Sequence, residues 1–356
     1  MRKRDACIVD EFRYGAWRPR MSVGRSRNGL RFVCADHEFV NETCGQPFSA
    51  ARFCAALQCR SVLMVGDSVM MTLFLALNTS YRIPRMSNYY CSSVTQNLCA
   101  TAPGGRCPGG INFTFVRNNH IIVDPSLDKT WAKANGEMLA QNCPIEPHLR
   151  RGMYGVVLAG SGLHMDRYSN VKGHDLRADW VWHRAKARSY MKSLRPLLQG
   201  TQLIWMKQHW GLLNYTAGPR PPLSEPQEMI PGNWSWNLLP GYNFIAAEAV
   251  RSELGSIGAM TIDPTRALAM RPDCRRTPDF WNVEQQTGKG KNHHGDWVHP
   301  DGSVLRYSAW PMVQNALETS LQSRTDTRRR GYGTIVEDFW SRAGTSAHVE
   351  RRRRIL

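Results

Sequence analysis

The sequence predicts a layered α/β fold with a mostly parallel central sheet. Short apolar runs rich in β-branched residues alternate with longer apolar or amphipathic stretches. The sharpest example is the run Ser61–Val65, which leads through Gly66-Asp67-Ser68 into the breaker-free stretch Val69–Leu77. This order of strand, tight turn and helix, followed later by helix-then-strand alternation, is typical of βα units whose strands lie parallel.

The remaining elements follow in chain order. Residues 1–56 have weak apolar periodicity and Arg-rich turns, which indicates an irregular, cysteine-containing lead-in. Residues 82–110 and the proline-rich stretch 214–242 are expected to be loops. Further strands are expected at 111–116, 121–123, 154–159, 202–206 and 261–263, and further helices at 178–198, 244–254 and 303–321.

This pattern predicts three parts of the chain. Residues 1–56 form an N-terminal segment that packs on the main domain, and residues 57–324 form that main domain. Residues 325–356 form a solvated basic tail, which contains two arginine runs, 328–330 and 351–354.

The composition narrows the class of protein. With 42% hydrophobic and 21% charged residues, the chain is neither disordered throughout nor fibrous. The 46 Lys and Arg against 29 Asp and Glu give a net charge of +17, which suggests an anionic partner or surface. No zinc finger, RNA-binding or helix-turn-helix signature accompanies the arginine runs, so no specific nucleic acid is expected. Anionic glycans or an anionic membrane surface would fit the positive charge as well as a nucleic acid would.

Cysteines and glycosylation sequons both favour an oxidising compartment. The ten cysteines include no Cys-x-x-Cys pair, which suits disulfides better than zinc, although buried thiols are the alternative. Five Asn-x-Ser/Thr sequons begin at Asn41, Asn78, Asn112, Asn214 and Asn233. The N-terminus MRKRDACIVDEF contains no signal peptide, and no apolar run is long enough to span a bilayer. We expect a disulfide-bonded glycoprotein of the secretory pathway, in the Golgi lumen or outside the cell, whose membrane anchor is missing from this sequence; a cytosolic chain is the alternative.

Ser68 is a candidate nucleophile. A serine that follows a buried strand and opens a helix lies at the carboxyl edge of the sheet, where open α/β sheets bind ligands. Its backbone N–H then lies near the positive end of the helix dipole, where an oxyanion is stabilised. The alternative is an ordinary helix cap, because Asp and Ser are both favoured there.

The candidate base lies near the end of the predicted main domain. In Asp296-Trp297-Val298-His299, a carboxylate three residues before an imidazole can hold one ring nitrogen and leave the other as a base. With His293 and His294 these residues could instead bind a metal, but two adjacent histidines rarely reach one ion. The acid–base interpretation is simpler, so we expect neither metal nor cofactor.

Three other side chains have two interpretations each. His164 follows a strand and could reach the substrate or be a hydrogen-bonded structural histidine. Trp234 and Trp236, on the proline-rich loop, could stack on sugar rings or anchor the loop on the core.

Several short blocks resemble the SGNH/GDSL hydrolase superfamily. The strand leading into Gly-Asp-Ser and the late Asp-x-x-His carry the general likeness. The blocks more closely resemble the branch of PC-esterases and trichome-birefringence-like polysaccharide O-acetyltransferases. They are Gly15-Ala16-Trp17, Phe53-Cys54, Arg60–Ser68, Ser161–His164 and Asp296–Gly302.

This resemblance implies a three-layer α/β/α, flavodoxin-like fold and a serine acyl-enzyme. Ser68 would be the nucleophile, His299 the general base and Asp296 the residue that orients it. The remaining implied oxyanion or substrate residues are Gly66, Asp67, Gly160, Gly162 and His164. The sequence departs from the family pattern at Gly160, where an asparagine usually helps to bind the oxyanion; losing one such donor costs about 3 kcal/mol of transition-state stabilisation.

The expected function is transfer of an acyl group, usually acetyl, to a carbohydrate, or hydrolysis of an ester on one. The partners would be a glycan or polysaccharide and an acyl donor, with an acetyl-CoA-derived group as one option. The second hypothesis, suggested by Gly160, is a glycan-binding relative with weak or no catalysis.

Overall fold

The computed structural model describes residues 16–19, 37–40, 48–77, 93–100, 107–120, 142–161, 176–209, 238–269 and 308–321. The chain divides into two compact units, residues 1–316 and 317–356, and every contact given below lies within the first. The predicted boundaries at 56/57 and 324/325 stay predictions. Within the described ranges, no helix is both long and apolar enough to cross a bilayer.

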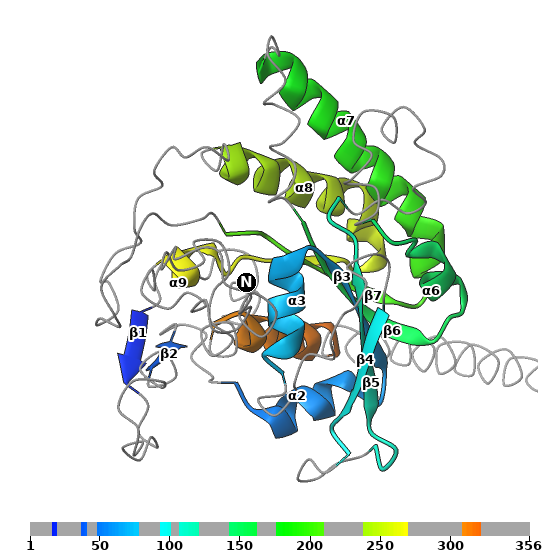
Figure 1. Ribbon diagram of the computed structural model, residues 1–356, viewed down its shortest axis with the longest axis vertical. Coiled ribbons are helices and arrows are strands. Elements are labelled where there is room, and N and C mark those ends of the chain that lie inside the picture. The colour runs from blue at the N-terminus through cyan, green and yellow to red at the C-terminus, as the bar shows by residue number, and fades with distance from the viewer. Residues whose placement is uncertain are drawn as a thin grey trace, which may run out of the picture. The chain divides into compact units, whose positions relative to one another are not determined.

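A six-stranded sheet forms the centre of the first unit (Figure 1). Its spatial order is β4-β5-β3-β6-β7-β8, and only β4 runs antiparallel to its neighbour. The strands are β3 (Ser61–Gly66), β4 (Ser93–Leu98), β5 (Ile111–Arg117), β6 (Tyr154–Gly160), β7 (Gln202–Met206) and β8 (Met260–Ile262). Numbered along the chain, the five parallel strands have the doubly wound order 2-1-3-4-5 of flavodoxin-like folds. The predicted fold class is confirmed.

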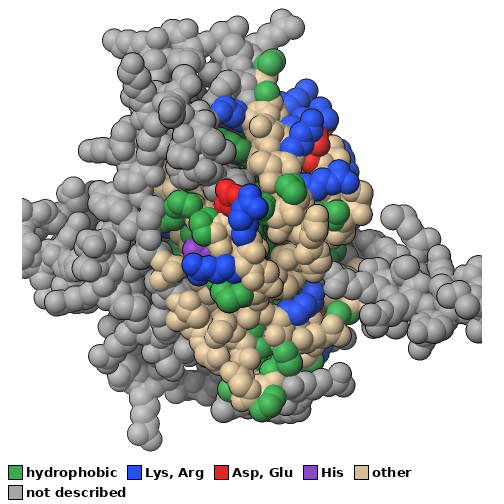
Figure 2. All heavy atoms as spheres, turned by 90° about the vertical axis from the view of Figure 1, so that its right-hand side faces the viewer, with side chains coloured by type: hydrophobic (Ala, Val, Ile, Leu, Met, Phe, Trp, Pro, Cys, Tyr) green, Lys and Arg blue, Asp and Glu red, His purple; other side chains and the backbone are tan. Residues whose placement is uncertain are grey.

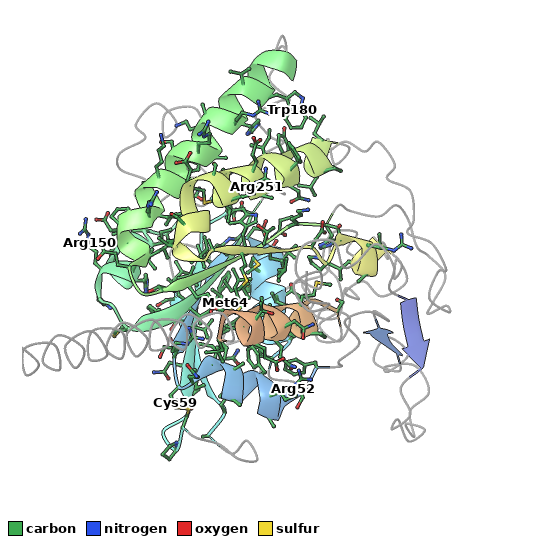
Figure 3. All side chains as sticks on the ribbon, turned by 180° about the vertical axis from the view of Figure 1, so that it is seen from behind. Arg52, Cys59, Met64, Arg150, Trp180 and Arg251 are labelled. Atoms are coloured by element: carbon green, nitrogen blue, oxygen red, sulfur yellow. A yellow bond between two sulfur atoms is a disulfide. The ribbon has the colours of Figure 1, made fainter. Side chains whose placement is uncertain are left out.

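Helices cover both faces of this sheet. They are α2 (Ala50–Leu57), α3 (Ser68–Leu75), α6 (Glu146–Arg150), α7 (Leu176–Leu194), α8 (Leu239–Leu254) and α9 (Thr265–Ala269), with a further helix over 308–321. Figures 1 and 3 show the strands running between α2 and the helix 308–321 on one side and α7 and α8 on the other.

The alternation of side chains along β3 explains the three layers. Leu63 and Val65 belong to a buried cluster that includes Met191 of α7 and Val250 of α8. Val62 and Met64 therefore face the opposite side, and Met64 is completely buried (Figure 3).

Aromatic packing holds the second helix layer on the sheet. Phe53 of α2 lies 5.9 Å from Phe113 of β5 and 5.3 Å from Trp310, measured between ring centroids. The indole N–H of Trp310 donates to the carbonyl oxygen of Leu73 in α3 at 3.1 Å. Phe74 of α3 completes the layer against Phe115. These rings pack α2, α3 and the helix that carries Trp310 onto this face of the sheet.

Three elements differ from the sequence predictions. Helix α2 lies mostly inside the stretch expected to be irregular; Ser49 caps it and it buries Phe53 and Leu57. Strand β4 lies in the stretch 82–110, which was expected to be a loop. It was missed because an edge strand needs only one buried face and can carry polar residues. One of these, Gln96, donates to the carbonyl oxygen of Phe74. Helix α8 begins at Leu239 rather than 244, since proline is tolerated in the first helical turn.

Smaller differences concern short elements. Helices α6 and α9 were not expected, and residues 16–19 and 37–40 form an antiparallel pair, β1 (Ala16–Pro19) and β2 (His37–Val40). The helix expected over 303–321 begins at 308 among the described residues. The predicted strand 121–123 lies outside the described residues.

Two arginines of α7 pair with acidic side chains of α8. Figure 2 shows Lys and Arg side chains on one face of the molecule, with a few Asp and Glu side chains beside them. Arg188 donates to Glu253 at 2.9 Å, and Arg184 lies 3.9 Å from Glu248. The hydrogen bond from Arg188 lowers the pKa of Glu253 below its usual value. Positive charge on this helix is therefore not by itself a sign of an anionic ligand.

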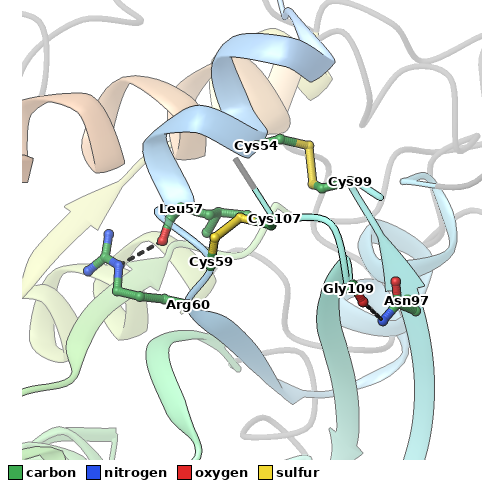
Figure 4. Close-up of a disulfide and its surroundings, with 8 residues drawn as sticks. All are labelled: Cys54, Leu57, Cys59, Arg60, Asn97, Cys99, Cys107 and Gly109. Carbon is green, nitrogen blue, oxygen red and sulfur yellow. Dashed lines mark hydrogen bonds between the residues drawn. A yellow bond between two sulfur atoms is a disulfide. The ribbon is translucent and has the colours of Figure 1, made fainter. Parts of the chain in front are cut away.

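Two disulfides lie side by side at the end of α2 (Figure 4). Cys54 is bonded to Cys99, just after β4, and Cys59 to Cys107, just before β5. The sequence separations are 45 and 48 residues. The expected disulfides are confirmed for these four cysteines, and they fit an oxidising compartment.

Replacing Cys54 and Cys99 together by alanine is expected to lower the free energy of unfolding by about 2–4 kcal/mol, because the unfolded chain regains the freedom that this loop removes. Urea denaturation followed by circular dichroism under non-reducing conditions measures the loss. Wild-type protein treated with a reductant opens both bridges and should lose more. An unchanged unfolding midpoint in the double variant would contradict the prediction.

Candidate functional site

Polar residues follow the carboxyl ends of four neighbouring parallel strands. Asp67 and Ser68 follow β3, residues 118–120 follow β5, Ser161 follows β6, and residues 208–209 follow β7. All of them are buried except Ser68, which is partly exposed. Since β3 lies between β5 and β6, Ser68 stands where the strand order reverses, the place at which open α/β sheets bind ligands.

Asp67 fixes the start of α3 and hence the position of Ser68. The carboxylate of Asp67 accepts a hydrogen bond from the N–H of Val69 at 3.0 Å, and its carbonyl accepts from Met71 at 3.1 Å. Asp67 is thus the N-cap, and Ser68 is the first residue of the helix. Asp67 is therefore the capping residue, and Ser68, which is partly exposed, stands in the first turn at the positive end of the helix dipole. The nucleophile role of Ser68 stays a prediction.

Gly66 lets this turn lie close to the neighbouring strand. Gly66 pairs in register with Gly160, the last residue of β6. A Cβ at position 66 would stand 2.2 Å from the carbonyl oxygen of Gly160 and 2.4 Å from Cγ of Met70. A side chain there would force β6 away from the first turn of α3.

Gly160 is equally closely packed. A Cβ at position 160 would stand 2.6 Å from Nε2 of Gln208 and 2.7 Å from the carbonyl oxygen of Met206. The space that an asparagine side chain would take at this position is occupied by the carboxamide of Gln208, two residues after β7.

The end of β5 carries a hydrogen-bonded group that sequence reasoning missed. Asn118 donates through its backbone N–H to Gly66 at 2.9 Å and through Nδ2 to Cys143 at 2.9 Å. The backbone N–H of His120 donates to Oδ1 of Asn142 at 3.0 Å, and the Ser161 hydroxyl donates to the carbonyl oxygen of Asn119. The available signal was the run of three polar residues directly after a buried strand.

A pocket opens beside this group on the α7 and α8 side of the sheet. It is small: its volume is about 30 Å³, room for about two water molecules. His120 and Ser161 line it at the sheet edge, and His183, Tyr242 and Trp205 supply rings from α7, α8 and β7. The His183 and Tyr242 ring centroids are 4.5 Å apart. Its lining is mostly apolar and aromatic, with the polar groups at the sheet-edge end.

The structure places half of the expected site residues. Ser68, Gly66, Asp67 and Gly160 lie together at the end of β3 and β6. The other four, Gly162, His164, Asp296 and His299, lie outside the described residues, as do His293, His294, Trp234 and Trp236. No group of three or more His, Cys, Asp or Glu side chains that could hold a metal occurs among the residues with described positions.

No family model matches the chain, and no curated protein matches it. Solved structures similar to it include an acetylxylan esterase from Geobacillus stearothermophilus, at 12% identity over 72% of this chain and 94% of that one, with a TM-score of 0.34. A catalytic mutant of the same enzyme gives 11% identity, the same coverages and the same TM-score. A GDSL-like lipase candidate from Parabacteroides merdae gives 13% identity over 73% and 96% of the two chains, also with a TM-score of 0.34. No family is assigned from likenesses at this level.

Gly66→Ala is expected to lower the free energy of unfolding by about 3 kcal/mol or more, because the new methyl group would overlap a backbone carbonyl that cannot rotate away. Gly109→Ala is the matched control: a Cβ there would have no neighbour within 4 Å. This variant should change the free energy of unfolding by less than about 0.5 kcal/mol. Equal urea midpoints for the two variants would show that the close approach at Gly66 does not limit stability.

Proposed function

We propose that the protein is a serine-dependent enzyme that moves an acyl group, most simply acetyl, through an ester on Ser68. The observation that carries the proposal is the position of Ser68. It is a partly exposed residue at the first position of a buried helix, just after the central strand β3 and at the reversal of strand order. A hydroxyl so placed meets an acyl carbonyl at the positive end of the α3 dipole.

The proposed reaction has two half-steps. The Ser68 oxygen attacks the acyl carbonyl, its proton passes to the ring of His299, and Asp296 orients that ring. Collapse of the tetrahedral intermediate breaks the ester bond, and His299 returns the proton to the leaving alcohol. A sugar hydroxyl or water then attacks the Ser68 ester in the same way, which gives transfer or hydrolysis respectively. The roles of Asp296 and His299 rest only on the sequence motif and on its resemblance to the family.

A carbohydrate is the proposed substrate class. The resemblance to PC-esterases and polysaccharide O-acetyltransferases supports it. Disulfides and sequons support a secretory-pathway or extracellular setting. The second candidate is a glycan-binding protein with little catalysis, which the missing side chain at Gly160 favours.

A serine-directed fluorophosphonate is expected to add once to the wild-type protein, not at all to Ser68→Ala, and more slowly to His299→Ala, because only an activated serine reacts. Intact-mass spectrometry measures the adduct. The control is Ser193→Ala, which removes an exposed hydroxyl on α7 and should label like wild type. If folded wild-type protein forms no adduct, the glycan-binding candidate takes precedence.

A further inference from the structure

Gln208 is a buried carboxamide at the carboxyl end of β7. Its side chain is completely buried, and neither Oε1 nor Nε2 has a hydrogen-bond partner in the part of the chain that the structure describes. Burying an amide without a hydrogen-bond partner lowers the stability of the folded state. A buried amide without a partner at the edge of the sheet where ligands bind is therefore a candidate donor of a hydrogen bond to a ligand.

The backbone of Gln208 is held by a paired hydrogen bond to Asn243 of α8. The Gln208 N–H donates to Oδ1 of Asn243 at 2.9 Å, and Nδ2 of Asn243 donates to the Gln208 carbonyl oxygen at 2.7 Å. Asn243 is itself buried. Both backbone groups of Gln208 are thereby satisfied by one side chain, which fixes the origin from which the carboxamide extends.

The carboxamide extends toward the start of α3. Leu203 and Trp205 of β7 face α7 and α8, so residues at the alternate positions, continued to 208, face the α3 side. Nε2 of Gln208 and Sδ of Met70 both lie within 3.1 Å of the point where a Cβ of residue 160 would stand. Met70 is two residues after Ser68, in the first turn of α3. The Gln208 amide therefore lies near the end of β6 and near Met70, in the first turn of the helix that begins at Ser68.

Attack by Ser68 on an acyl carbonyl would create an oxyanion that needs more than one fixed donor. The N–H of Ser68 is one such donor, and Gly160 offers no side chain for a second. We propose that Nε2 of Gln208 donates a hydrogen bond to this oxyanion; the proposal rests on the acyl-transfer function proposed above for Ser68. Because both ends of the carboxamide lack partners among the described residues, turning its N–H end toward the oxyanion breaks no hydrogen bond.

The chain contains a matched control for this role. Gln202 is on β7, is 1% exposed, and likewise has no partner for either carboxamide atom within the described residues. It begins the strand, so it lies at the opposite end of the sheet from Ser68. The two glutamines share residue type and burial, and they stand at opposite ends of β7, Gln202 at its start and Gln208 two residues after its end.

The test uses the full chain with its disulfides intact and p-nitrophenyl acetate as the acyl donor. Gln208→Met keeps the side-chain volume and removes the donor, and it is expected to lower kcat by about 10²–10³-fold with little change in KM. Gln202→Met should stay within about twofold of wild type. A trifluoromethyl ketone, which forms a tetrahedral adduct with an activated serine, should bind Gln208→Met more weakly by a factor similar to the loss in kcat/KM.

Each outcome separates this proposal from the function on which it rests. If Ser68→Ala hydrolyses the ester as fast as wild type, the acyl-enzyme is wrong and the role of Gln208 is overturned with it. If hydrolysis depends on Ser68 but Gln208→Met behaves like Gln202→Met, only the role of Gln208 is overturned. Should Gln208→Met fail to fold by circular dichroism, Gln208→Asn withdraws the amide by one methylene; a folded Asn variant with wild-type kcat also overturns the proposal.

Discussion

The contact between the ends of β3 and β6 is the constraint on which the rest of the site depends. Gly66 and Gly160 are paired there, and neighbours occupy the volume that a side chain would take at each. At Gly66 these are the backbone of β6 and Met70, and at Gly160 it is Gln208. This close approach lets α3 start directly at the sheet edge rather than after a longer loop. The dipole of α3, the Asp67 cap and the Ser68 hydroxyl can therefore act at the point where the strand order reverses.

The sequence predicted the elements whose side chains are buried on both faces of the sheet. Runs such as Ser61–Val65 and Gln202–Met206 are short and almost wholly apolar, and few other structures suit them. Strand β4 escaped prediction because one of its faces is polar, and the first turn of α8 was missed because Pro240 and Gly241 usually interrupt helices. In the structure, Gly241 gives room to the Trp180 ring, which a Cβ would meet at 2.2 Å.

The candidate site also contains residues that the sequence predicts and residues that it does not. Ser68 was predictable because strand, turn and nucleophile are adjacent in sequence. Gln208 was not predictable, because its neighbours Gly160 of β6 and Asn243 of α8 are distant in sequence and approach it only when the chain folds. The polar residues after β5 gave a local signal, but their hydrogen bonds to Gly66, Asn142 and Cys143 span up to 52 residues of chain. Buried polar groups of this kind specify one arrangement of the strand ends, since any other would leave them unsatisfied.

The two disulfides have a consequence for recovery from unfolding. Their loops interlace, since Cys59 lies inside the loop closed by Cys54 and Cys99, and Cys99 lies inside the loop closed by Cys59 and Cys107. Residues 61–75, which form β3 and α3, lie within both loops. In the oxidised unfolded chain this segment stays covalently close to the residues that form β4 and β5, so the entropic cost of bringing them together is already reduced. Refolding after heat or denaturant can begin around the strand that carries Ser68, whereas a reduced chain must first find that pairing by diffusion.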